Sequence, residues 1–180
     1  MRPTGQDKAG GKKMKKVGIL MGSDSDLPVV QKAIDVLREL DIPFEAHVMS
    51  AHRTPEAAAS FAKGAIEGGF GVLIGAAGMA AHLAGALAAN TVLPVIGLPI
   101  HGGAMDGLDA LLATVEMPWG IPVATVAIDG GTNAGLLAAE ILALEDEGLR
   151  DRLAARRAAE AQRVAEKDKK LQKTLADQLK

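Results

Sequence analysis

The clearest indication of the fold is the stretch Val17-Gly18-Ile19-Leu20-Met21-Gly22-Ser23-Asp24-Ser25-Asp26-Leu27-Pro28. Its first five residues form a continuous apolar run, which predicts a strand buried on both faces of a parallel sheet. Asp26 and Pro28 are residue types typical of the start and first turn of a helix. The stretch therefore predicts a strand, a polar turn and a helix, which together form the repeating unit of an α/β fold.

The same alternation of strand and helix continues along the chain. Further strands are expected at 44–49, 71–74, 92–98 and 122–128, and further helices at 54–65, 80–89, 108–115 and 133–144. The sequence thus predicts a single doubly wound parallel sheet, in a flavodoxin-like three-layer α/β/α domain. The 80–89 helix has almost only small apolar residues, so we expect it to pack closely on a neighbour, with His82 about one turn into it.

Composition divides the 180 residues into one central domain and two flanking segments. Residues 1–15 are rich in Lys and Gly and predict a disordered basic tail. Residues 16–144 form the α/β domain. Residues 145–180 are rich in Ala, Arg, Lys and Glu and predict a C-terminal helical extension. That helix is expected to pack one apolar stripe on the body or on another subunit, rather than to act as a nucleic-acid arm.

Composition also disfavours several classes of function. The net charge is −2 and aromatic residues make up 2%, so neither a nucleic-acid partner nor a membrane partner is expected. The absence of Cys excludes disulfides and thiol chemistry. No apolar run reaches the ~18 residues of a membrane span, and Met1 to Lys16 lacks the apolar core of a secretory signal. A cytoplasmic location is therefore expected.

Polar turns follow the predicted strands, and they hold the candidate functional residues. The backbone of Gly22-Ser23-Asp24-Ser25-Asp26 suits a phosphate or carboxylate, although Ser25 and Asp26 could simply cap the helix. Ser50-Ala51-His52-Arg53-Thr54-Pro55 places a titratable imidazole beside a permanent cation, although a lone His is often structural. Because the carboxyl ends of parallel strands meet at one edge, these turns predict a single pocket.

Several familiar motifs are missing from these turns. The first turn is not the Gly-x-Gly-x-x-Gly dinucleotide fingerprint, and no acidic residue ends the second strand. There is no Walker lysine, and His101-Gly102-Gly103-Ala104 has no accompanying Gly-x-Ser-x-Gly elbow. His52 and His82 lack the spacing of a zinc-binding helix. The turns therefore predict neither a nicotinamide, nor a nucleoside triphosphate, nor a zinc site.

Taken together, the turns resemble those of a known enzyme family. The segments that carry the resemblance are 22–26, 50–55, 80–83 and Met117-Pro118-Trp119-Gly120-Ile121-Pro122-Val123-Ala124-Thr125. They are similar to the class I N5-carboxyaminoimidazole ribonucleotide mutases, the small bacterial enzymes of purine biosynthesis. The resemblance covers roughly residues 16–144 in order. It implies a homo-octamer that acts on a ribonucleotide and uses no metal, nucleotide or organic cofactor.

The resemblance also implies the roles of individual residues. The substrate would lose carbon dioxide from its exocyclic nitrogen, and ring carbon 4 would capture that carbon dioxide, with His52 as general acid and base. Ser23 and Arg53 would hold anionic groups and Asp26 the ribose. The substrate-binding residues expected on this basis are Gly22, Ser23, Asp26, Ser50, Ala51, Arg53, Gly78, Ala80, His82 and Leu83.

The sequence departs from the family pattern at a few positions, and two rival functions stay open. Met79 stands where the family usually has glycine, and Ala84 where it usually has proline. Arg53 favours the mutase, because the animal-type carboxylase that uses free carbon dioxide usually has Lys there. That carboxylase is one alternative. The other is a non-catalytic nucleotide-binding module, which would need no titratable group beside Arg53.

Overall fold

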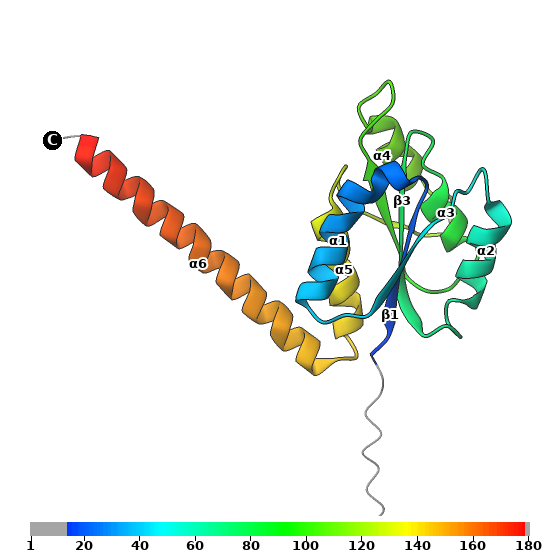
Figure 1. Cartoon of the computed structure of the whole chain (residues 1–180), viewed down its shortest axis with the longest axis horizontal. Helices are drawn as coiled ribbons and strands as arrows, with labels where there is room; N and C mark the ends of the chain where they lie inside the picture. Colours follow the sequence, from blue (N-terminus) through cyan, green and yellow to red (C-terminus); the bar gives the residue numbers. More distant parts are fainter. Residues whose placement is uncertain (1–13, 179–180) are drawn as a thin grey trace, which may run out of the picture.

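The computed structural model describes residues 14–178, which form a five-stranded parallel sheet with helices on both faces (Figure 1). The strands are β1 (Lys16–Met21), β2 (Phe44–Val48), β3 (Phe70–Gly78), β4 (Val95–Ile100) and β5 (Ala124–Thr125). They lie in the order β2-β1-β3-β4-β5, and all pairs are parallel. This is the doubly wound order of flavodoxin-like proteins, so the predicted fold class is confirmed.

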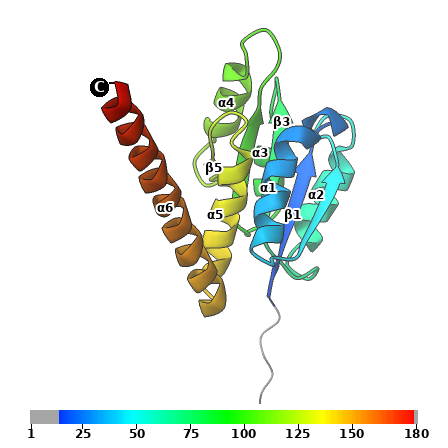
Figure 2. The ribbon, with the colours of Figure 1, turned by 60° about the vertical axis from the view of Figure 1, so that its left-hand side comes forward.

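Helices cover both faces of the sheet, as two views of the ribbon show (Figures 1 and 2). On one face lie α1 (Leu27–Glu39) and α5 (Gly131–Ala143), and on the other lie α2 (Pro55–Gly64) and α3 (Leu83–Ala88). A further helix, α4 (Leu108–Val115), packs against β4. In β1, Ile19 joins the core under α1 and α5, whereas Leu20 joins the core under α2 and α3. Both are fully buried, as the apolar run predicts.

Small residues bring α3 close to the sheet, but the helix is shorter than expected. A Cβ added to Gly75 would lie 2.8 Å from the Cα of Ala84, so the two backbones can meet only because Gly75 has no side chain. The predicted start at residue 80 is wrong, because β3 continues to Gly78 and a tight turn follows it. The backbone N–H of Ala81 donates to the carbonyl of Met79 at 2.9 Å. His82 therefore precedes the helix rather than lying one turn inside it.

The last strand is also shorter than the predicted 122–128. Only Ala124 and Thr125 form it, at the edge of the sheet beside β4. Pro122 has no N–H to donate to a ladder. After the strand, the backbone N–H of Val126 donates to Gly97 and that of Asp129 to Pro99, so the chain still follows β4 closely. These bonds lead the chain directly into α5.

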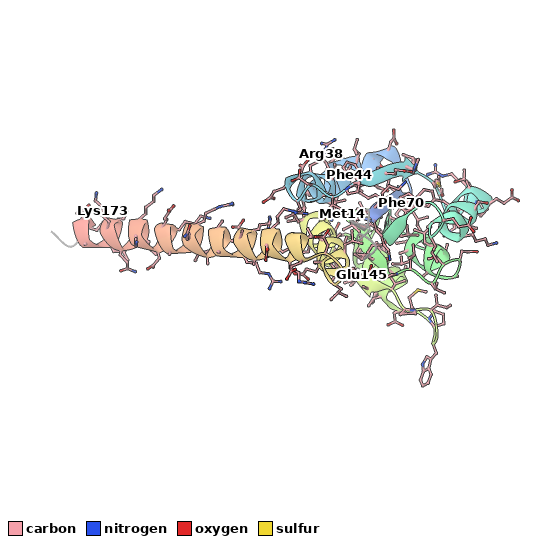
Figure 3. All side chains as sticks on the ribbon, turned by 90° about the horizontal axis from the view of Figure 1, so that it is seen from below. Met14, Arg38, Phe44, Phe70, Glu145 and Lys173 are labelled. Atoms are coloured by element: carbon pink, nitrogen blue, oxygen red, sulfur yellow. The ribbon has the colours of Figure 1, made fainter. Side chains whose placement is uncertain are left out.

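The helix expected over 145–180 is α6 (Glu147–Gln178). Its first turns pack on the body, where Leu149 and Leu153 are buried and the Nε of Arg152 donates to the carbonyl of Leu40 at 3.2 Å. Its outer part, which carries Lys173, stands away from the body (Figures 1 and 3). Most of the predicted basic tail, residues 1–13, lies outside the described residues. Within residues 14–178, no helix is long and apolar enough to cross a membrane.

Candidate active site

A cavity of about 700 Å³ lies at the carboxyl ends of the strands, which is the upper edge of the sheet in Figure 1. The turns after β1, β2, β3 and β4 line it. The structure brings all of the predicted site residues to this one cavity. They are Gly22, Ser23, Asp26, Ser50, Ala51, His52, Arg53, Gly78, Ala80, His82 and Leu83. The carboxyl edge of a doubly wound sheet is where ligands of this fold bind.

The turn after β1 is held by two reciprocal hydrogen bonds. The Oγ of Ser23 accepts from the backbone N–H of Ser25 at 3.3 Å, and the Oδ2 of Asp26 accepts from the backbone N–H of Ser23 at 3.1 Å. This capping box forms on the short 3-10 helix of residues 24–26. The expected side-chain cap on α1 is absent, because the Asp26 carboxylate bonds back to Ser23 instead.

Asp26 is the least exposed charged group of the cavity. Its exposed fraction is 7%, although it carries a carboxylate. Burial raises the pKa of this carboxyl above its ordinary value, and the hydrogen bonds from Ser23, Ser25 and Gly22 oppose that rise. A buried carboxylate that keeps acceptor capacity next to a cavity suits recognition of a hydroxyl-rich ligand.

The turn after β2 is organised by Ser50. Its Oγ accepts from the backbone N–H groups of His52 and Arg53 at 3.3 and 3.2 Å. The Oγ1 of Thr54 accepts from the backbone N–H of Ser50 at 2.9 Å, so Thr54 braces this turn and makes no side-chain cap on α2. The guanidinium of Arg53 donates to the carbonyl of Gly22 at 3.0 Å. This bond ties the first two turns together and leaves other N–H groups of the guanidinium for a ligand.

Two histidines from different turns, one after β2 and one after β3, meet at the cavity. The Nε2 of His52 lies 2.8 Å from the Nδ1 of His82, and the two rings are inclined at 77°. A hydrogen bond between two ring nitrogens requires a hydrogen on one of them and a lone pair on the other. The pair can therefore pass a hydrogen from ring to ring, and it lies exposed where a ligand could reach it.

The lining also includes residues outside the expected substrate-binding set, chiefly in the turn after β4. The additional residues are Ser25, Ala77, Met79, Ile100, His101, Gly102 and Gly103. The backbone N–H of His101 donates to the Oδ1 of Asp129 at 2.8 Å, and its Nδ1 lies 3.2 Å from the carbonyl of Asp106. The order of the strands would have revealed this turn, because β4 lies directly beside β3.

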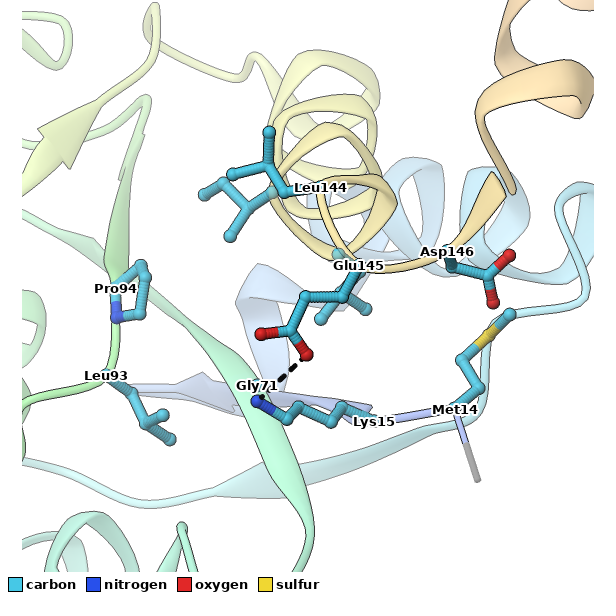
Figure 4. Close-up of a pocket in the computed structure, with 10 residues that line it drawn as sticks. Met14, Lys15, Gly71, Leu93, Pro94, Leu144, Glu145 and Asp146 are labelled. Atoms are coloured by element: carbon cyan, nitrogen blue, oxygen red, sulfur yellow. Dashed lines mark ion pairs between the residues drawn. The ribbon is translucent and has the colours of Figure 1, made fainter. Parts of the chain in front are cut away.

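A second cavity, of about 250 Å³, lies at the opposite ends of the strands (Figure 4). It lies between Leu93 and Pro94 on one side and the end of α5 on the other. Its charged groups include Lys15 and Glu145, which form an ion pair at 3.6 Å. This cavity gathers no histidine, so the acid-base chemistry points to the larger one. Among residues 14–178, no three His, Asp or Glu side chains are grouped so that they could hold a metal ion.

This chain is similar to known proteins of one enzyme family. The pattern of the AIR carboxylase family matches residues 16–163. The chain is 54% identical to an N5-carboxyaminoimidazole ribonucleotide mutase of Mycobacterium tuberculosis over 158 residues, 88% of this chain and 91% of that protein. It is 55% identical to one of Pyrococcus abyssi over 140 residues, 78% of this chain and 80% of that protein. The crystal structure of Treponema denticola PurE superposes with a TM-score of 0.77 at 31% identity, covering 86% of this chain and 97% of that chain.

Proposed function

The chain belongs to the AIR carboxylase family, and we propose that it converts N5-carboxyaminoimidazole ribonucleotide to 4-carboxy-5-aminoimidazole ribonucleotide in purine (IMP) biosynthesis. Relatives that carry the name of this mutase share more than half of their aligned residues with the chain. The observation that carries the proposal is the contact between His52 and His82, 2.8 Å apart in the same cavity as Arg53. The enzyme is an isomerase, because the carboxyl group moves within one molecule.

The reaction needs one proton donated and one removed. Decarboxylation breaks the bond between the exocyclic nitrogen and the carboxyl carbon, and the nitrogen keeps the electron pair and gains a proton. Ring carbon 4 then attacks the released carbon dioxide and loses its own proton. His52 supplies the first proton and accepts the second, and His82 holds the His52 ring through their hydrogen bond. Their 2.8 Å contact supports this assignment, because the hydrogen-bonded pair can return to its starting protonation state after each turnover.

The other lining residues bind the ribonucleotide. Ser23 and Arg53 hold its anionic groups, because the first turn presents backbone N–H groups and Arg53 is a permanent cation. Asp26 accepts from the ribose hydroxyls. Gly78, Ala80 and Leu83 surround the reacting carboxylate with apolar groups, which excludes water around the carbamate and the carbon dioxide. The support for these roles is that all of these residues line one cavity.

Assembly and location belong to the same proposal. We place the enzyme in the cytoplasm as a homo-octamer, with α6 reaching across a subunit boundary. Support comes from the outer part of α6, where Val164, Leu171 and Leu175 are 65%, 54% and 44% exposed. Apolar residues on a helix that stands away from its own body are stabilised when another subunit covers them. Closed symmetry is the usual way to cover repeated patches.

Comparing two starting materials tests this function against its rivals. The purified chain is given either the N-carboxylated nucleotide, or the unsubstituted aminoimidazole ribonucleotide with bicarbonate. A mutase forms the 4-carboxy product faster from the first at equal nucleotide concentration. Faster product formation from the second would indicate the carboxylase that uses free carbon dioxide. Binding of either nucleotide with no product would indicate a non-catalytic module.

A further inference from the structure

Met79 has an uncommon backbone conformation at the rim of the cavity. It is the residue immediately after β3, with φ of +54°, in the left-handed region that glycine adopts easily and methionine rarely. Its side chain lines the cavity, and the residue is 62% exposed. A left-handed non-glycine residue persists where the surrounding structure holds it, and such residues cluster at functional sites.

The loop after β4 makes room for this side chain. A Cβ added to Gly103 would lie 3.3 Å from the Cγ of Met79 and 3.0 Å from the Oδ2 of Asp109. Gly103 also has a φ of +71°, so its backbone favours glycine as well. Met79 therefore lies against bare backbone at Gly103. The two residues follow the neighbouring strands β3 and β4 and meet on one side of the cavity.

We infer that Met79, packed on Gly103, forms a wall that slows the escape of carbon dioxide from the cavity during the reaction; this inference rests on the proposed function. Carbon dioxide has no charge and only weak hydrogen-bond acceptors, so covering the cavity retains it better than polar contacts do. A thioether side chain is apolar and flexible enough to fill an irregular gap over a bound ring. Met79 thus determines how faithfully the released carboxyl group returns to the same nucleotide.

Isotope exchange measures this escape directly. The N-carboxylated nucleotide, with an unlabelled carboxyl group, reacts in a single turnover in ¹³C-bicarbonate, with carbonic anhydrase present and enzyme in excess. Mass spectrometry then gives the fraction of 4-carboxy product that carries ¹³C. We expect this fraction to rise about fivefold in Met79→Gly, the effect of a modest change in the relative barriers to escape and capture. Met79→Ala keeps a side chain at the left-handed position and should give a similar rise, which would assign the effect to the thioether.

Matched variants separate this wall from other effects. Met105→Ala removes an exposed methionine outside the cavity lining, and it should leave the ¹³C fraction unchanged. Gly103→Ala should displace Met79 and raise the fraction, and combining it with Met79→Gly should add little, because the two residues act as one contact. A thermal melt checks folding, and Met79→Gly should melt no lower than the wild type because glycine relieves the left-handed strain.

The outcomes distinguish the inference from the proposed function. Unchanged ¹³C fractions in both Met79 variants, in an enzyme that still forms product, would overturn the wall and leave the mutase assignment standing. If the wild-type chain formed no product from the N-carboxylated nucleotide, the proposed function itself would fail.

Discussion

The Nε2 of His52 and the Nδ1 of His82 lie 2.8 Å apart, although 30 positions separate the two residues in the chain. The turn after β2 supplies one ring, and the turn before α3 supplies the other. Their contact places an acid-base pair inside the cavity that Arg53 and Asp26 also line.

Replacement of His52 tests the proton-transfer role. His52→Asn removes the titratable ring, and kcat should fall about 10²- to 10⁴-fold, the usual contribution of a positioned acid-base group. Equilibrium binding of the product nucleotide should stay within about threefold, because other residues supply the anchors. His47→Asn is the matched control, since His47 lies on β2 outside the cavity lining. More than about a tenth of wild-type activity in His52→Asn would refute the assignment.

Replacement of His82 tests whether the pair works as a unit. His82→Phe keeps a ring but removes the nitrogen that contacts His52, so kcat should fall about tenfold or more while KM changes little. The double variant His52→Asn/His82→Phe should be no slower than His52→Asn alone, because residues that act together lose their effect together. Steady-state kinetics on the three variants checks this. Multiplicative losses would show that His82 acts independently of His52.

The guanidinium of Arg53 is expected to matter for its shape as well as its charge. It donates to the carbonyl of Gly22, and in Arg53→Lys a point charge replaces the planar fork. We expect KM to rise about tenfold, the equivalent of ~1.4 kcal/mol, with a smaller change in kcat. Arg163→Lys on α6 is the control for a surface arginine. An unchanged KM in Arg53→Lys would remove Arg53 from the binding site.

We expect the charge of the Asp26 carboxylate to favour ribose binding but to lower the stability of the folded chain at neutral pH. Burial raises the pKa of Asp26 in the folded chain above its ordinary value of 3.8, so the folded state holds the proton more tightly than the unfolded state does. The free energy of unfolding contributed by this group is therefore largest below pH 3.8 and falls as pH rises through the raised pKa. Asp26→Asn lacks this loss, because asparagine does not titrate. Its amide oxygen can still accept the hydrogen bond from the backbone N–H of Ser23.

Urea titrations at several pH values check this conflict. At neutral pH, Asp26→Asn should be at least as stable as the wild type, and its relative advantage should shrink as the pH is lowered toward 3.8. Its KM should rise about tenfold, because the carboxylate that accepts from the ribose is gone. A variant that is less stable at neutral pH and has an unchanged KM would contradict both roles given to Asp26.

The outer part of α6 should contribute to assembly. A chain that ends at Ala158 keeps Leu149, Leu153 and the ion pair of Arg156 with Glu39, so the body should still fold. Light scattering after size exclusion should show a compact oligomer near eight copies for the full chain and smaller species for the shortened one. A shortened chain that stays octameric would remove α6 from the interface. A full-length monomer at micromolar concentration would refute the octamer.

The sequence predicts the fold where one strong local pattern decides the structure. The short apolar run before Gly22, followed by a polar turn, predicts a buried strand, and β1 is that strand. The start of α3 could not be predicted, because small apolar residues suit both the end of β3 and a helix. The contact of Gly75 with Ala84 decides between them in three dimensions.

The lining of the cavity could be predicted in part for a similar reason. The turns after β1 and β2 could be predicted to line a binding site, because Ser23, Asp26 and His52 are residue types that suit ligand binding and acid-base chemistry. From the turn after β4, the residues that line the cavity are His101, Gly102 and Gly103, and two glycines give no comparable signature in sequence. It reaches the cavity because β4 pairs with β3, a relationship that only the assembled sheet provides.

The path of one carbon atom distinguishes the mutase reaction from simple loss of carbon dioxide. The N-carboxylated nucleotide is prepared with ¹³C in its carbamate carboxyl group and mixed with the purified full chain in buffer free of bicarbonate and nucleoside triphosphates, and ¹³C NMR follows the label. If the chain is the mutase, the carbamate signal is replaced by the signal of a carboxylate on ring carbon 4, and His52→Asn stops this change. Loss of the label to free carbon dioxide and bicarbonate, with no carboxylate formed on carbon 4, would refute the mutase reaction.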